Sequence, residues 1–117
     1  MTITFLGLAF DAANAADLAA FWAQATHGTV EDGASDDHAV VSGTDLPRLA
    51  FHRVPEGKTA KNRLHLDLLA SHYDAEIDRL LDLGARKLNE LTSGTARWST
   101  LADPEGNEFD VIAGSTA

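Results

Sequence analysis

The most restrictive feature of this sequence is an internal repeat that divides it into two halves of similar pattern. In each half a short apolar segment is followed by one amphipathic helical segment and then by three segments with strand character. The glycines expected to end the two helices, Gly28 and Gly84, lie 56 positions apart. The same offset places LAFD at 8–11 on LHLD at 64–67. The sequence therefore predicts two copies of one β-α-β-β-β unit.

The first half contains the helical segment with the clearest signals. Asn14 is a suitable N-cap residue, and Asp17 falls in the first turn, where a carboxylate is favourable. Gly28 is the residue at which this helix is expected to end. Its apolar face repeats at helical spacing and consists of Leu18, Phe21, Trp22 and Ala25. Strands are predicted at residues 3–10, 38–42 and 49–54, with a short one near Val30.

The second half repeats this order. A strand is predicted at residues 64–69, and a helix follows that ends at Gly84. The apolar face of this helix consists of Tyr73, Ile77, Leu80 and Leu81. Three further strands are predicted at residues 85–91, 96–101 and 108–113. Between the last two lies DPEG at 103–106, with Asp, Pro and Gly at the positions that a type I turn favours.

Length and composition limit the chain to one domain. With 117 residues, 44% of them hydrophobic, it is long enough for one core and too short for two ordinary domains. We expect a single domain over 1–117, with module one at about 1–57 and module two at about 61–117. No apolar stretch reaches the roughly 18 to 20 residues of a membrane span, and the N-terminus lacks the features of a signal peptide. A cytoplasmic protein without a membrane partner is therefore expected.

Charge and cysteine content exclude several classes of function. Eighteen acidic against nine basic side chains give a net charge of -9, and the cations form no stripe, so nucleic acid is not an expected partner. The absence of cysteine leaves only nitrogen and oxygen donors for any metal. No phosphate-binding glycine loop, nucleophile elbow or HExxH helix is present, so kinase-like, α/β-hydrolase and zincin chemistries have no support.

Four segments make the sequence similar to the vicinal oxygen chelate superfamily, the glyoxalase and bleomycin-resistance group. They are DLAAFW at 17–22, FHRVPEGKTAKNRLHLDL at 51–68, LLDLGA at 80–85 and LADPEGNEFDVI at 101–112. The resemblance covers nearly the whole chain, and KNRLHLDL points to the glyoxalase-like branch. It implies an α+β fold in which paired βαβββ modules form a curved mixed sheet around a cleft. It also implies a homodimer.

The resemblance further implies a divalent metal held at matching strand positions of the two modules. The third and fourth ligand positions of the superfamily fall on His65 and on Asp110, which replaces the usual glutamate. The second falls on His52, which the internal repeat pairs with Asp110. The first falls on Gly7 or Ala9, neither of which has a donor atom. His52, His65 and Asp110 are therefore the expected ligands of a three-ligand site for iron, manganese, zinc or nickel.

Three more residues are candidates for contact with a small-molecule ligand. Glu108 faces the same way as Asp110 if their strand is regular, and it is the candidate for proton transfer. Phe51 and Trp98 are candidate ligand-binding side chains, since an aromatic ring can stack on a flat molecule.

Simpler interpretations of the polar candidates stay open. His65 can be a packed, hydrogen-bonded residue rather than a ligand, and His52 can be an exposed side chain. Asp67 either orients the imidazole of His65 or pairs with Arg63.

Two functions are compatible with these residues. One is a metal-dependent lyase or isomerase of a small oxygen-rich substrate, in which the metal polarises adjacent oxygens. The other is a metal-free protein that binds a drug-like or aromatic metabolite in the cleft, as bleomycin-resistance relatives do. Convergence of His52, His65 and Asp110 to within about 4 Å of one point would favour the enzyme. No motif in the sequence is specific for one substrate.

Overall fold

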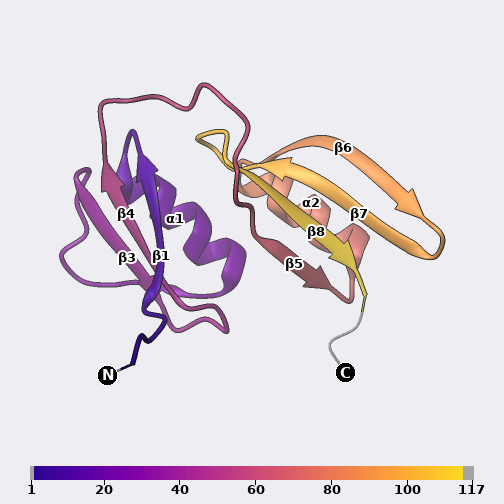
Figure 1. Ribbon diagram of the computed structural model, residues 1–117, viewed down its shortest axis with the longest axis horizontal. Helices are drawn as coiled ribbons and strands as arrows, with labels where there is room; N and C mark the ends of the chain where they lie inside the picture. The colour runs from indigo at the N-terminus through magenta and orange to yellow at the C-terminus, as the bar shows by residue number, and fades with distance from the viewer. Residues whose placement is uncertain (1, 115–117) are drawn as a thin grey trace. The chain divides into compact units, whose positions relative to one another are not determined.

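The computed structural model of the protein describes residues 2–114. The chain forms two compact units, Met1–Gly57 (unit 1) and Lys58–Ala117 (unit 2), and within the described residues each holds one helix and four strands (Figure 1). Unit 1 contains β1 (Gly7–Ala12), α1 (Ala15–Thr26), β2 (Thr29–Val30), β3 (His38–Ser42) and β4 (Arg48–Arg53). Unit 2 contains β5 (Asp67–Ala70), α2 (Tyr73–Leu83), β6 (Arg86–Ser93), β7 (Ala96–Ala102) and β8 (Glu108–Ala113). The predicted α+β fold of two βαβββ modules is confirmed.

The two sheets have the same topology. Their strand orders are β1-β4-β3-β2 and β5-β8-β7-β6, and in each the first and last strands of the unit pair in parallel while the other pairs are antiparallel. The parallel pairs place Asp11 opposite His52 in unit 1 and Asp67 opposite Asp110 in unit 2. The internal repeat seen in the sequence therefore extends to the register of the strands, and His52 and Asp110 occupy equivalent positions.

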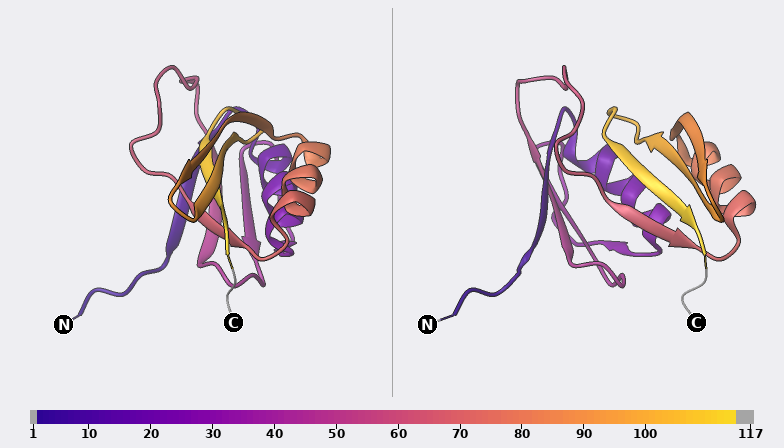
Figure 2. Two further views of the ribbon diagram at one scale, coloured as in Figure 1. Left: turned by 90° about the vertical axis from the view of Figure 1, so that its right-hand side faces the viewer. Right: turned by 45° about the vertical axis from the view of Figure 1, so that its right-hand side comes forward.

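The core of unit 1 lies between α1 and one face of its sheet (Figure 2). Phe10 stacks on Phe51 with ring centroids 4.9 Å apart and also contacts Trp22 at 5.5 Å. Phe51 is completely buried and Trp22 nearly so. Because side chains alternate along a strand, His52 points to the opposite, helix-free face of the sheet.

Two predicted strands begin later than expected. The strand predicted at 3–10 begins at Gly7, and Ile3, Phe5 and Leu6 are exposed before it. Gly7 pairs with Arg48, and the preceding Pro47 has no N–H group with which to extend the ladder. The strand predicted at 64–69 begins at Asp67, so that His65 lies in the segment before β5.

The predicted start of the first helix is confirmed, but the role of Gly28 is not the one expected. The side chain of Asn14 accepts a hydrogen bond from the Asp17 N–H at 2.9 Å. The left-handed residue that ends α1 is His27, with φ of 58°. Gly28 is needed for a different reason, because a Cβ atom there would lie 2.4 Å from Thr44 Cγ2. At the end of α2, Gly84 has a φ of 121°, as its predicted role requires.

The helix side of the unit 2 sheet carries a polar network that attaches α2 to its edge. The guanidinium of Arg97 lies 4.4 Å from the centre of the Tyr73 ring and donates to Glu90 and Asp74, both at 3.1 Å. The Tyr73 hydroxyl also meets the buried Ser99 hydroxyl. The hydrogen bond from Arg97 is the main cause that lowers the pKa of Glu90. These contacts are structural, which leaves the other face of the sheet as the candidate surface for function.

Neither helix of residues 2–114 combines the length and the apolar character that a membrane span requires.

Candidate functional site

The candidate site lies on the face of the unit 2 sheet that points away from α2, which we call the open face. Leu101, Phe109 and Val111 are buried on the helix side of the sheet. Because side chains alternate along a strand, their neighbours in each strand point to the open face. They are Trp98 and Thr100 on β7, Glu108, Asp110 and Ile112 on β8, and Asp67 and Leu69 on β5. Four sequence-derived candidates of unit 2, His65, Trp98, Glu108 and Asp110, therefore belong to this face or to the segment that leads into it.

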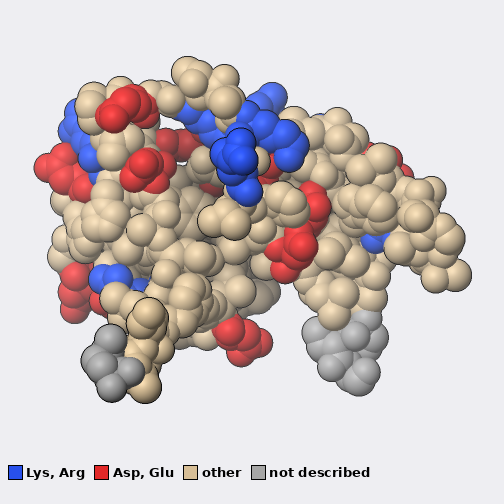
Figure 3. All heavy atoms as spheres, in the orientation of Figure 1, with Lys and Arg blue, Asp and Glu red and all other residues tan. Residues whose placement is uncertain are grey.

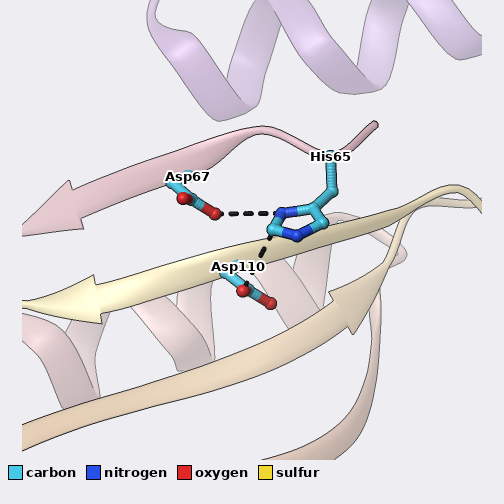
Figure 4. Close-up of side chains that lie close together, drawn as sticks. All are labelled: His65, Asp67 and Asp110. Carbon is cyan, nitrogen blue, oxygen red and sulfur yellow. Dashed lines mark ion pairs between the residues drawn. The ribbon is translucent and has the colours of Figure 1, made fainter. Parts of the chain in front are cut away.

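His65 is held beside two carboxylates. Its Nδ1 atom lies 3.0 Å from Asp67 Oδ1 and 3.9 Å from Asp110 Oδ2. Figure 4 shows the imidazole between the two carboxylates, with dashed lines for these two ion pairs. One donor atom of each of the three residues lies within 4.8 Å of the others. The backbone explains the position of His65, because the Asp110 N–H donates to the Leu66 carbonyl at 2.9 Å and so holds this segment against β8.

The orientation of Asp110 is set by its neighbour on β7. Thr100, its register partner, donates its hydroxyl to Asp110 Oδ1 at 2.6 Å. The second oxygen, Oδ2, is the one closest to His65. Thr100 was not among the residues expected from the sequence. The sequence places Thr100 and Asp110 on the two strands that flank the DPEG turn, and the register of the hairpin makes them partners.

Glu108 is bound by a cation from the segment that precedes β5. Lys58 Nζ lies 2.8 Å from Glu108 Oε1, and the Asn62 amide donates to the Glu108 carbonyl at 3.2 Å. The hydrogen bond from Lys58 is the main cause that lowers the pKa of Glu108, ahead of partial burial, which raises it. Glu108 is therefore a carboxylate at neutral pH. Figure 3 shows basic side chains gathered over this connecting segment, which contains Lys58, Lys61 and Arg63.

Replacing Lys58 with alanine should raise the pKa of Glu108 towards its ordinary value, because the strongest stabilisation of the carboxylate is lost. Because the pKa of Glu108 is lowered in the folded protein, its ionised form stabilises the fold at pH values above the pKa of this group in the unfolded chain. This stability is lost as the pH falls through the pKa of the folded state. Carboxyl-carbon NMR titration of wild type and Lys58→Ala checks the shift. Lys61→Ala is the matched control and should leave the Glu108 titration unchanged. Equal titration curves in wild type and Lys58→Ala would contradict the pairing.

Two of the predicted site residues, Phe51 and His52, belong to unit 1. Phe51 was expected to contact a ligand, but its side chain is fully buried and stacks on Phe10 on the helix side of the sheet. It is therefore a core residue, because the alternation of a strand keeps it off the face that presents His52. His52 is exposed next to His38. Its place in one metal site with His65 and Asp110 stays a prediction.

The first ligand position expected from the superfamily has no donor in this chain, and at Gly7 the backbone leaves no room for one. A Cβ atom on Gly7 would lie 2.2 Å from the Arg48 carbonyl oxygen. Backbone atoms of a paired strand cannot give way as the end of a flexible side chain can. No residue larger than glycine fits this position, so a histidine ligand there is excluded sterically.

Next to the polar cluster the open face becomes apolar. Trp98 is half-buried and lies between two register partners, Leu91 on β6 and Ile112 on β8. Leu91 and Leu69 are both exposed by more than two-fifths, at 43% and 48%. The face thus combines acidic and imidazole donors with an aromatic and aliphatic surface. Contact of Trp98 with a ligand stays a prediction.

A family model described as a glyoxalase-like domain matches residues 7–112, which is almost the entire chain. No match was found among curated proteins.

Several solved structures share the fold. A variant of the fosfomycin resistance protein FosX from Listeria monocytogenes, complexed with Mn(II) and 1S,2S-dihydroxypropylphosphonic acid, has a TM-score of 0.79 at 12% identity, covering 99% of this chain and 94% of that one. A glyoxalase/bleomycin resistance protein/dioxygenase family enzyme from Burkholderia phytofirmans has a TM-score of 0.76 at 14% identity, with coverages of 94% and 98%. The hypothetical protein SA1046 from S. aureus has a TM-score of 0.76 at 10% identity, with coverages of 97% and 96%. At such identities the likeness shows the fold alone.

Proposed function

Since the chain belongs to the glyoxalase-like family, we propose that its open face binds a small oxygen-rich molecule through a divalent metal and that the protein acts on it as a lyase or isomerase. The observation that carries this proposal is the convergence of His65, Asp67 and Asp110. Two ligand atoms that each lie about 2.2 Å from one metal are at most roughly 4.4 Å apart. The donors of this cluster lie within 4.8 Å of one another, close to that limit.

The donor set indicates the kind of metal. Two carboxylates and one imidazole suit manganese, iron(II) or zinc better than a soft ion. FosX, which shares the fold, was solved with Mn(II). A metal bound here would supply Lewis-acid polarisation of substrate oxygens. Thr100 would keep Asp110 oriented through its hydroxyl, in the way that residues around metal ligands usually do.

Glu108 is the residue we propose for proton transfer. It shares the open face with Asp110, two positions along β8, and it is deprotonated at neutral pH, as a base must be. The ion pair with Lys58 lowers its basicity, so proton abstraction would require Lys58 to turn towards the substrate or solvent. Trp98 would pack on the apolar part of the same substrate.

A second function, metal-free binding of a small molecule, is supported by one specific observation. The Nδ1 atom of His65 already has a partner, Asp67, at 3.0 Å, so this nitrogen is satisfied without an ion. In that case the apolar surface around Trp98 would provide most of the binding area.

Metal analysis by mass spectrometry distinguishes the two functions. Protein without a histidine tag is incubated with Mn(II), Fe(II), Zn(II) or Ni(II), desalted and analysed. We expect Mn(II) or Fe(II) to be retained by wild type and lost in His65→Ala and in Asp110→Ala, because each change removes one of three ligands. The loss of affinity should be at least about 10- to 100-fold.

The control is His72→Ala, which removes an exposed histidine at the start of α2 and outside the cluster. It should keep the metal. Equal retention by His65→Ala and wild type would remove His65 from the site. No Mn(II) or Fe(II) binding by wild type at micromolar concentrations would favour the binding protein, and Trp98 fluorescence would then be the assay for aromatic ligands.

We also propose that two copies of the chain form a homodimer. β1 and β5 are edge strands of their own sheets, and exposed edges of this kind are usually paired or covered. The exposed apolar residues Ile3, Phe5 and Leu6 precede β1 directly. Sedimentation velocity at several concentrations tests this, and a monomer throughout would refute it.

A further inference from the structure

Two histidines lie side by side on the helix-free face of the unit 1 sheet. His38 on β3 and His52 on β4 are direct partners in the antiparallel ladder. Their ring centroids are 4.9 Å apart and the rings are tilted by 47°. Both side chains are exposed, so both imidazoles are accessible to ions from solvent. The function proposed for unit 2 makes no use of this pair.

We propose that His38 and His52 form a second divalent-metal site, contained in unit 1 and selective for copper(II), nickel or zinc. With a metal–nitrogen distance of about 2.0–2.1 Å, two imidazoles bound at a tetrahedral or square-planar angle have ring centres roughly 4.5–5 Å apart. The observed separation of 4.9 Å falls in that range. The neighbouring strands therefore hold the rings at a chelating distance before any ion arrives.

The ring nitrogens are available for binding. Within residues 2–114 no hydrogen bond or ion pair engages either imidazole, and the contact of His38 with Ser35 is made by its backbone N–H. An imidazole nitrogen lone pair is a donor that copper(II), nickel and zinc accept readily. The pair therefore binds a metal without first breaking another interaction.

Asp11 lies beside the pair and adds a negative charge to the same face. It is the register partner of His52 on β1, and strand alternation directs its exposed carboxylate to the same face. Across three neighbouring strands, unit 1 thus has the row Asp11, His52 and His38. The equivalent row in unit 2 is Asp67, Asp110 and Thr100. Nitrogen donors replace oxygen donors, so the two units should prefer different ions.

A copper(II) titration of the untagged protein tests this site. Electron paramagnetic resonance of the wild type should show coupling to two nitrogens, and His38→Ala should reduce it to one. The second imidazole binds intramolecularly once the first is bound, so its loss should weaken copper(II) binding roughly 100-fold. His38 is the residue to change because His52 is also a predicted ligand of a site with His65 and Asp110, whereas His38 belongs to this pair alone.

Two further variants separate this proposal from the unit 2 site. His72→Ala removes another exposed histidine, and it should leave the copper spectrum and affinity unchanged. His65→Ala should abolish manganese retention and keep the two-nitrogen copper signal. Copper affinity in His38→Ala within about twofold of wild type would overturn the proposal, and so would a two-nitrogen signal that depends on His65. Circular dichroism confirms that each variant is folded.

Discussion

Replacing Phe51 with alanine should lower the free energy of unfolding by about 3–5 kcal/mol, the usual cost of truncating a fully buried aromatic residue. Phe51 is completely buried and stacks on Phe10, and its register partner Ala39 is too small to fill the space that its ring would leave. Natural domains are stable by about 5–15 kcal/mol, so this change should bring the chain close to unfolding at room temperature. Urea denaturation measures the loss.

The matched control is Phe5→Ala. Phe5 is 71% exposed, and the same chemical change there should alter stability by no more than about 0.5 kcal/mol. A loss below about 1 kcal/mol in Phe51→Ala, or equal losses in both variants, would show that the Phe51 ring is not in the core. The ligand contact expected from the sequence would then become the better explanation for this residue.

Replacing Asp103 with alanine should have the second-largest effect. The carboxylate is almost completely buried in the DPEG turn and accepts hydrogen bonds from the Glu105 and Asn107 N–H groups, at 2.9 and 3.0 Å. It also accepts from the Asn107 side-chain amide at 2.9 Å. Alanine would leave these donors without the carboxylate, and each donor that stays buried and unpaired costs about 1–3 kcal/mol. We therefore expect the free energy of unfolding to fall by about 3 kcal/mol or more.

The effect of Asp103 should also reach the candidate site, because this turn leads directly into β8 and therefore positions Glu108 and Asp110. We expect Asp103→Ala to weaken Mn(II) binding while Asp103→Asn, which keeps one oxygen acceptor, retains most of the stability and of the binding. Differential scanning calorimetry and metal titration of both variants check this. Similar melting temperatures for Asp103→Ala and wild type would show that the turn forms without its carboxylate.

Local signals were sufficient for the regular elements. The bounds of β8 and the capping of α1 by Asn14 agree with the predictions, because period-2 alternation and a side-chain cap involve residues a few positions apart. The same rule of alternation, applied strictly, would have separated Phe51 from His52, since adjacent residues of a strand face opposite sides.

Contacts between residues that are distant in the sequence could not be predicted from such local signals. Lys58 was not among the candidate site residues expected from the sequence, yet it binds Glu108. Thr100 orients Asp110 through a hairpin register that the sequence alone left open. His65 was expected on a strand and lies before one, because the pairing of β5 with β8 begins only at Asp67 and Asp110. Each of these outcomes depends on strand pairing rather than on the residue itself.

The sequence by itself determined the repeated βαβββ unit, the helices and their apolar faces, because hydrophobic periodicity and turn residues act over a few neighbouring positions. It also determined that any metal must be bound by nitrogen and oxygen, since the chain has no cysteine. Only the tertiary structure decided which donors meet. Asp67 and Asp110 are far apart along the chain, and they become neighbours through the parallel register of β5 and β8, which arises from long-range packing of the sheet on α2.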